Sequence, residues 1–419
     1  MLLHSGKMPI KLTTCLFAII LMISSCTPGQ STHATLIPSA TLPAVSTSSP
    51  LPTLTPTQTP VPPTDTPAPE PGFVINGQPF KFLGAFVPGR YWGEWSIAND
   101  IAILTEAKKA GFTVLHLMPP QYEKTLGNYN EAELKKLDHF MNVANQNGIY
   151  ITIPFLQGLA TATQAGTQYA DAFANPGGIE GLIHQSTLRT AFKAHMAALI
   201  SRVNTVNGRK YSEDPTLMSW MIAEEIVSAP FNYPQGFPNV TAAEVAAWVQ
   251  ENAAYIKTLD ANHLVSLNTT TGVDSFDQLG QDWMPIVEAP ALDFVEVEDA
   301  EARIRDHPDQ MYTIDKMYEL NKPVVMMLSF TGGGVDKNKY CSDYRWQADT
   351  YRQIVDLYLN KGATGFTIFS WRSSQNTNWE CYSYNIDTPE VIQALQDISS
   401  ELGSLNVAPQ PLDFVRLVQ

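Results

Sequence analysis

The sequence predicts a (β/α)8 TIM barrel with enlarged βα loops over residues 72–408, and three observations support this fold class. From Phe73 onward, short apolar runs alternate with segments of helical periodicity, and eight such pairs fit into roughly 330 residues. The apolar runs are nearly continuous, which is typical of parallel strands covered on both faces. A doubly wound open α/β sheet is the competing fold, and the count of eight favours the barrel.

The expected strands and helices follow one another in strict alternation. The strands are short apolar segments and cover residues 81–87, 112–118, 149–155, 217–223, 263–267, 293–297, 323–328 and 365–370. The helices show helical spacing of apolar residues and cover residues 97–110, 131–147, 187–206, 241–259, 309–320, 343–360 and 389–402, with a weaker stretch ending near residue 288. The second helix ends at Gly148, a common residue at helix ends.

The amino-terminal region is expected to be a processing signal. Within residues 1–25, Lys7 and Lys11 precede an apolar run over residues 16–23 that is too short to span a bilayer as a mature helix. The residues Ile23-Ser24-Ser25-Cys26 resemble the lipobox of bacterial lipoproteins, in which the cysteine is lipidated and becomes the new amino terminus. The alternative is a plain secretory signal with an incidental cysteine.

A linker separates this signal from the folded domain. Residues 26–71 are rich in Pro, Thr and Ser and are expected to be extended and solvated. Together with lipid on Cys26, this composition predicts an extracytoplasmic protein that contacts a bacterial membrane only through its lipid anchor. Residues 409–419 are expected to form a C-terminal tail.

Charge and cysteine usage narrow the range of partners. The formal net charge is −15 and no basic cluster is present, which argues against nucleic acid and leaves a neutral polysaccharide open. The histidines lack metal-ligand spacing and there is no G-x-S-x-G elbow, so we expect no metal and no cofactor.

We also expect a monomer. Cys341 and Cys381 fall in the folded domain, where they either form a disulfide or stay free thiols.

The most informative segment joins a predicted helix to the fourth strand. The strand ends in Glu224 and Glu225, and two adjacent carboxylates after an apolar strand are costly unless they have a partner or a task. In a (β/α)8 barrel, catalytic residues lie at the carboxyl ends of the strands. This placement makes Glu225 the first candidate for a catalytic acid.

Four segments carry a resemblance to a known family. They are residues 73–85 (an opening hairpin and strand), 127–138 and 144–153 (the second helix and third strand), and 214–225 (similar to D-P-T-I-x-x-W-x-L-x-N-E). On these segments the chain resembles clan A glycoside hydrolases, and most closely the β-mannanase-like members of family 5. The resemblance covers most of residues 73–400 and implies that Glu225 is the general acid/base.

The chain departs from the family pattern at four strand ends. Glu224 replaces the Asn before the acid/base, His116 occupies the place of an Arg, and Glu298 that of a His. The seventh strand of the family ends in a nucleophilic Glu. Here that position holds Leu328, or Ser329 if the register is shifted by one residue.

A second carboxylate is therefore expected from another strand. Hydrolysis of a glycoside generally needs two carboxyl groups, about 5–5.5 Å apart for retention and about 6.5–9.5 Å apart for inversion. Glu298 is the first choice and Glu296 the second, and both face the same side of one strand. Strands four and six would lie roughly 9.5 Å apart, which suits inversion with Glu225 as acid and Glu298 as base. The alternative is a structural ion pair of Glu298 with His116 or Arg303.

Further binding residues are predicted around these acids. Glu224 either repels the charge of Glu225, which favours its protonated form, or hydrogen-bonds a substrate hydroxyl, as the replaced Asn would. Aromatic residues gather in the loops after strands one, seven and eight, where flat rings suit sugar faces. Trp92 is one candidate, and the family resemblance implies that Trp371 faces substrate.

Three functions are compatible with this pattern. The first is a cell-surface glycoside hydrolase that acts on a β-linked polysaccharide or its oligomers, with a mannan-like substrate favoured. The second is an inactive barrel that binds glycan at the cell surface, and the third, a lipoprotein without a ligand, fits poorly with the clustered acids and aromatics. The fold alone does not choose between the first two, and pairing and burial of Glu296 and Glu298 away from the cleft would favour the second.

Overall fold

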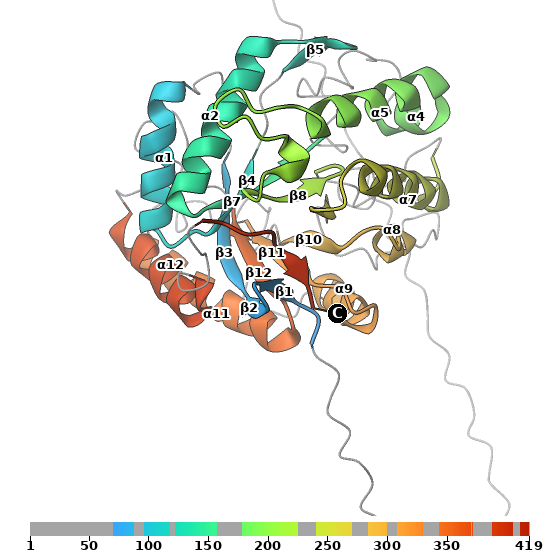
Figure 1. The fold of residues 1–419 in the computed structure, drawn as a ribbon. Helices are drawn as coiled ribbons and strands as arrows, with labels where there is room; N and C mark the ends of the chain where they lie inside the picture. Colours follow the sequence, from blue (N-terminus) through green and yellow to red (C-terminus); the bar gives the residue numbers. More distant parts are fainter. Residues whose placement is uncertain are drawn as a thin grey trace, which may run out of the picture. The chain divides into compact units, whose positions relative to one another are not determined.

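A closed parallel barrel forms the centre of the folded domain in the computed structural model (Figure 1). The structure describes residues 70–87, 96–117, 122–156, 178–224, 240–269, 284–299, 308–329, 343–369, 371, 388–404 and 411–418. The barrel strands, in spatial order, are β3 (Phe82–Val87), β4 (Val114–Leu117), β7 (Tyr150–Pro154), β8 (Leu217–Met221), β9 (Leu264–Thr269), β10 (Phe294–Asp299), β11 (Val324–Leu328) and β12 (Gly365–Ile368). The prediction of a (β/α)8 barrel is confirmed, and strands four and six of the barrel are indeed separated by one strand.

Helices surround the barrel and cover the outer face of its strands (Figure 1). They are α1 (Ile97–Lys109), α2 (Glu131–Asn147), α4 (Gly178–His184), α5 (Ser186–Ile200), α7 (Ala242–Leu259), α8 (Pro285–Glu288), α9 (Pro308–Glu319), α11 (Tyr344–Lys361) and α12 (Pro389–Glu401), with a 3-10 turn at Tyr211–Glu213. The helix α7 begins with a capping box in which Thr241 and Glu244 satisfy each other's backbone N–H groups. The helix α2 ends at Gly148 in the left-handed conformation, with φ of 69°.

Three features of the structure around the barrel differ from the sequence-based expectation. The helix α5 ends at Ile200 rather than near residue 206, because the chain turns at Arg202 to contact α2. A hairpin of β5 (Glu123–Thr125) and β6 (Asn128–Tyr129) follows β4 and was not expected from the sequence. The α4 helix, seven residues long, was likewise missed, because it carries too few apolar repeats to show a clear period.

Side chains alternate between the two faces of each barrel strand. In β10, Val295 and Val297 belong to the core beneath the helices, whereas Phe294 packs in a second cluster at the amino-terminal end of the barrel. Glu296 and Glu298 share the face of Phe294 because strand residues two apart point the same way. Glu296 reaches His116 across the interior, and the expectation that Glu298 shares its orientation stays a prediction.

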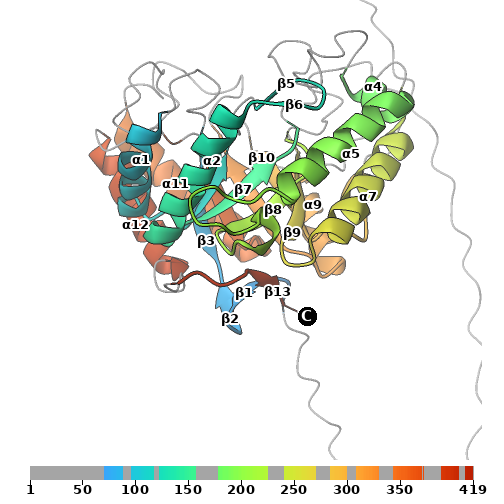
Figure 2. The same cartoon turned by 45° about the horizontal axis from the view of Figure 1, so that its top comes forward.

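A small antiparallel sheet lies at the amino-terminal end of the barrel strands, on the side opposite to the β5–β6 hairpin (Figure 2). It consists of β13 (Arg416–Leu417), β1 (Phe73–Ile75) and β2 (Gln78–Phe80). Its aromatic residues join those of the barrel, and Phe73 meets Phe294 edge to face at 5.2 Å between ring centroids. We call the cluster of Phe73, Ile75, Phe80, Phe82, Val114, Tyr150, Met218, Leu264, Phe294, Val325, Leu412 and Val415 the floor of the barrel.

The carboxyl-terminal residues belong to the folded domain, so the domain extends further than the sequence predicted. Residues 409–419 were predicted to form a tail, but β13 pairs with β1 and both Leu412 and Val415 are buried in the floor. Burying these side chains removes apolar surface from water, so the segment is part of the folded domain. Among the residues described, no helix combines the length and the apolar character needed to cross a bilayer.

Candidate functional site

A buried pair of charged side chains crosses the interior of the barrel. His116 of β4 and Glu296 of β10 belong to strands that stand opposite each other in the closed sheet. Their side chains nevertheless meet, with 2.8 Å between His116 Nδ1 and Glu296 Oε2. The pair lies one inward layer above the floor, because Val114 and Phe294 precede the two residues by two positions on their strands.

Polar side chains from other strands complete this layer. Asn268 of β9 donates from Nδ2 to Glu296 Oε2 at 3.1 Å, and Thr367 of β12 also hydrogen-bonds Glu296. Glu224, three residues after β8, places Oε1 at 3.7 Å from His116 Nε2. We call His116, Glu224, Asn268, Glu296 and Thr367 the mouth cluster.

The charges of the mouth cluster are mutually stabilised. Burial alone would lower the pKa of His116, but the field and hydrogen bond of Glu296, helped by Glu224, raise it above the usual value. Burial alone would raise the pKa of Glu296, but His116, Thr367 and Asn268 together lower it. Both directions describe an imidazolium paired with a carboxylate in a site where each side chain is at most 4% exposed.

Aromatic packing holds the imidazole in place. Phe86 of β3 meets the His116 ring edge to face at 5.2 Å and stacks on Phe369 at 5.0 Å. Among the described residues, His116 Nε2, which is buried, has no hydrogen-bond partner within the usual distance, because Glu224 Oε1 lies 3.7 Å away. The free side of the imidazolium is therefore the side nearest to the carboxylate that follows β8.

Glu298 occupies the next inward position towards the carboxyl end of β10. It lies opposite Met327 in the sheet and its side chain is 7% exposed. Two residues along a strand separate it from Glu296 by about 6.6 Å. His116 pairs with Glu296, two residues earlier on the same strand, and Arg303, the other partner considered for Glu298, lies outside the described residues.

Parity along β11 decides which residue faces the interior where the family carries its nucleophile. Leu328 is fully buried in the core beneath the helices. Val325 belongs to the floor, so Met327 and Ser329 follow it on the inward face. Ser329 is buried and its backbone N–H donates to the Asp299 carbonyl at 2.9 Å. The inward position therefore carries a hydroxyl rather than a carboxylate.

Trp371 is placed differently from the expectation. Its side chain is 1% exposed and meets Phe112 edge to face at 5.1 Å, within the core that includes the outward residues of the strands. Its backbone N–H donates to the Phe86 carbonyl at 2.8 Å. An aromatic residue just past an apolar strand can close the core as readily as it can face a ligand, and here it packs in the core.

Several predicted residues lie outside the described part of the chain. These are Glu225, Trp92, the proposed lipidation site Cys26, and the cysteines Cys341 and Cys381. Their roles stay predictions, as do those of Glu298 and Glu224.

Two members of the mouth cluster were not predicted from the sequence. Asn268 and Thr367 are polar residues at inward positions near the carboxyl ends of otherwise apolar strands. That pattern is the same one that identified Glu296, so the signal was present. Among the described residues, no three histidine, cysteine, aspartate or glutamate side chains converge as a metal site.

Comparison with known proteins shows which families the chain is similar to. Residues 161–296 match the family model described as glycoside hydrolase family 5 β-mannosidase-like. Mannan endo-1,4-β-mannosidase 4 of Oryza sativa subsp. japonica is 30% identical over 158 residues, which are 37% of this chain and 32% of that protein. Mannan endo-1,4-β-mannosidase 1 of the same organism is 27% identical over 267 residues, which are 57% of each protein.

Solved structures share the fold. The endo-1,4-β-mannanase from Rhizomucor miehei superimposes with a TM-score of 0.62 at 17% identity, over 80% of this chain and 99% of that one. The endo-β-1,4-mannanase from Thermotoga petrophila gives a TM-score of 0.60 at 18% identity, over 78% of each chain. The chain spans between about a third and somewhat over half of the length of the first two curated relatives. The resemblance to the β-mannosidase-like glycoside hydrolases of family 5 is thus confirmed.

Proposed function

We propose that this chain, which resembles the β-mannosidase-like glycoside hydrolases of family 5, cleaves internal bonds of a β-linked, mannan-like polysaccharide. The observation that carries the proposal is the buried mouth cluster. Three ionisable side chains, His116, Glu224 and Glu296, are concentrated in one layer towards the carboxyl ends of the strands. Burying such charges costs stability, and in barrels of this kind the carboxyl end is where catalysis takes place.

Glu225 would act as the general acid. In the proposed reaction it protonates the glycosidic oxygen as the bond to the anomeric carbon breaks, and a water molecule attacks that carbon from the opposite face. Glu298 would accept the proton of the attacking water, so that Glu225 ends as carboxylate and Glu298 as acid. The missing carboxylate at Ser329 supports a water-mediated, inverting route over a covalent intermediate on β11.

His116 and Glu296 would prepare the site for this reaction. The imidazolium is fixed by Glu296 and by Phe86, and its Nε2–H faces Glu224 Oε1 at 3.7 Å. A preoriented donor of this kind can hold a sugar hydroxyl or stabilise negative charge that develops near it. Glu224 would then accept a hydrogen bond from a hydroxyl of the same sugar. Its carboxylate would take the place of the Asn side-chain amide that the family carries at this position.

The test is hydrolysis of β-mannan, β-glucan and xylan by the wild type and by Glu225→Gln and Glu298→Gln. Loss of either group should lower kcat by about 10²–10⁴-fold, because each takes part in proton transfer. Glu390→Gln, a change at an exposed position of α12, is the matched control and should leave kcat unchanged. Proton NMR of the first product should show inversion of the anomeric centre.

A second function is favoured by one observation. Ser329 stands where the family carries its nucleophile and Glu296 is already committed to His116, which would suit a barrel that binds glycan without cleaving it. No hydrolysis of any polymer, together with retained glycan affinity, would support this function and end the hydrolase proposal. Hydrolysis that persists in Glu298→Gln would instead exclude Glu298 as the base.

We also propose that the domain is displayed outside the cytoplasm on a lipid anchor. The support is the lipobox-like Ile23-Ser24-Ser25-Cys26 and the Pro/Thr/Ser-rich segment after it. Labelled palmitate should be incorporated into the wild type and not into Cys26→Ala, which should leave the membrane fraction. Labelling of the variant would contradict the assignment of Cys26.

A further inference from the structure

A pocket lies between α2 and α5, and the elements that line it differ from the barrel strands that carry the mouth cluster. Its volume is about 300 Å³, and its walls come from the first turns of α2, the strand β6 and the end of α5. The residues that define its character are Tyr122, Tyr129, Glu131, Leu134, Arg202 and Val203. Sites for small ligands begin at about this volume, so the pocket suits a single ring rather than a large cofactor.

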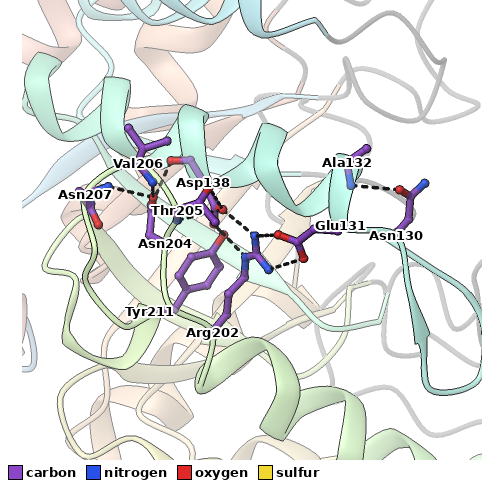
Figure 3. Close-up of polar contacts among 10 residues, drawn as sticks. All are labelled: Asn130, Glu131, Ala132, Asp138, Arg202, Asn204, Thr205, Val206, Asn207 and Tyr211. Atoms are coloured by element: carbon purple, nitrogen blue, oxygen red, sulfur yellow. Dashed lines mark hydrogen bonds and ion pairs between the residues drawn. The ribbon is translucent and has the colours of Figure 1, made fainter.

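One wall of the pocket is a preorganised set of charges (Figure 3). Arg202 donates from Nε and Nη2 to the Asp138 carboxylate at 2.9 and 2.6 Å. It also donates from Nη1 and Nη2 to the two Glu131 oxygens at 3.0 and 2.8 Å. Asp138 is fully buried and accepts further hydrogen bonds from Tyr211 and Thr205 at 2.7 Å. The guanidinium is therefore held in one orientation before any ligand arrives.

The other residues that line the pocket are mostly aromatic or apolar, and we call them its second wall. Tyr122 stacks on His195 with 5.3 Å between ring centroids, and its hydroxyl lies 3.0 Å from His195 Nε2. His195 Nδ1 in turn lies 2.6 Å from the buried Glu123, which fixes the β5–β6 hairpin to α5. Burial, helped by the nearby charge of Glu123, raises the pKa of Tyr129 to about 12, so its phenol stays neutral at physiological pH.

The chemistry of the two walls selects a class of ligand. Arg202 with Glu131 and Asp138 carries a formal charge of −1, and the whole chain is acidic, so an anion is disfavoured. In a carboxylate–guanidinium pair the carboxylate can accept from one hydroxyl and the guanidinium can donate to the neighbouring hydroxyl, which is the pattern of a vicinal diol. Tyrosine rings and Leu134 offer flat apolar surface to the C–H face of a sugar ring.

We propose that this pocket binds one glycosyl unit of a neutral polysaccharide, as a second carbohydrate site outside the barrel mouth. The inference rests on the proposed function for the identity of the polymer. A chain held at two places leaves more slowly than one held at a single place, because the second contact forms at high effective concentration. The pocket would thus retain long polymer without taking part in bond cleavage.

The test combines retention of the full-length protein in native gels containing β-mannan with hydrolysis of a short soluble mannooligosaccharide. Tyr129→Ala removes an aromatic wall and should weaken retention by roughly fivefold or more. Val203→Arg places a long side chain at an exposed position of the rim, where it should block the pocket without disturbing the core. Tyr312→Ala, at an exposed tyrosine of α9, is the matched control and should behave as the wild type.

The outcomes separate this site from the catalytic proposal. Weaker retention in both pocket variants, with kcat/KM on the short substrate unchanged, supports the second site. The second site is overturned if Val203→Arg keeps native circular dichroism and is retained as strongly as the wild type. It is also overturned if β-mannan does not retain the wild type. Pocket-dependent retention without any hydrolysis would leave the second site standing and remove the hydrolase function instead.

Discussion

The two ends of the barrel interior are built from the same strands and have opposite chemistry. At the amino-terminal end, inward positions carry Phe294 on β10 and Val114 on β4, and these residues pack in the floor. Two residues further along the same strands, the inward positions carry Glu296 and His116, joined at 2.8 Å. The comparison separates two tasks: apolar side chains fill the floor for stability, whereas the layer above it contains charges that no packing argument requires.

The first prediction removes apolar volume from the floor. Phe294 is 3% exposed and packs on Phe73, so Phe294→Ala should lower the free energy of unfolding by about 3–5 kcal/mol through lost transfer energy and a cavity. Denaturation in urea measures this change. Activity per folded molecule should stay near that of the wild type. A loss of activity in the folded variant would show that the floor contributes to catalysis as well as to stability.

The second prediction breaks the mouth cluster in two steps. His116→Leu leaves Glu296 buried without its partner charge and should cost about 3–5 kcal/mol. The double variant His116→Leu/Glu296→Leu removes both charges and should recover most of that loss, while glycan hydrolysis falls in both proteins. A double variant as unstable as the single one would mean that the pair contributes to stability, as the floor does.

The third prediction concerns pH and is the smallest in size. The raised pKa of His116 contributes stability that is complete below the usual value of 6.5 and is lost as pH rises through the folded-state pKa. The lowered pKa of Glu296 contributes stability that is present above the usual value of 4.5 and is lost as pH falls through the folded-state pKa. The free energy of unfolding of the wild type, relative to that of the double variant, should therefore be largest between about pH 4.5 and 6.5.

Urea titrations of both proteins across this range measure the difference. It should shrink on the acidic side as Glu296 takes up a proton and on the alkaline side as His116 loses one. A difference that is constant with pH would show that the two side chains are not paired as ions. The floor variant provides the control, because no titrating group is changed in Phe294→Ala.

Much of this architecture was determined by the sequence alone. Strand periods and helix periods are local properties, so the eight strands, most helices and the common face of Glu296 and Glu298 could be predicted. Only barrel closure decided that Glu296 meets His116, a residue 180 positions away on the opposite strand. Closure and packing also decided that Trp371 is buried against Phe112 and that β13 joins the floor, because both depend on contacts between segments distant in sequence.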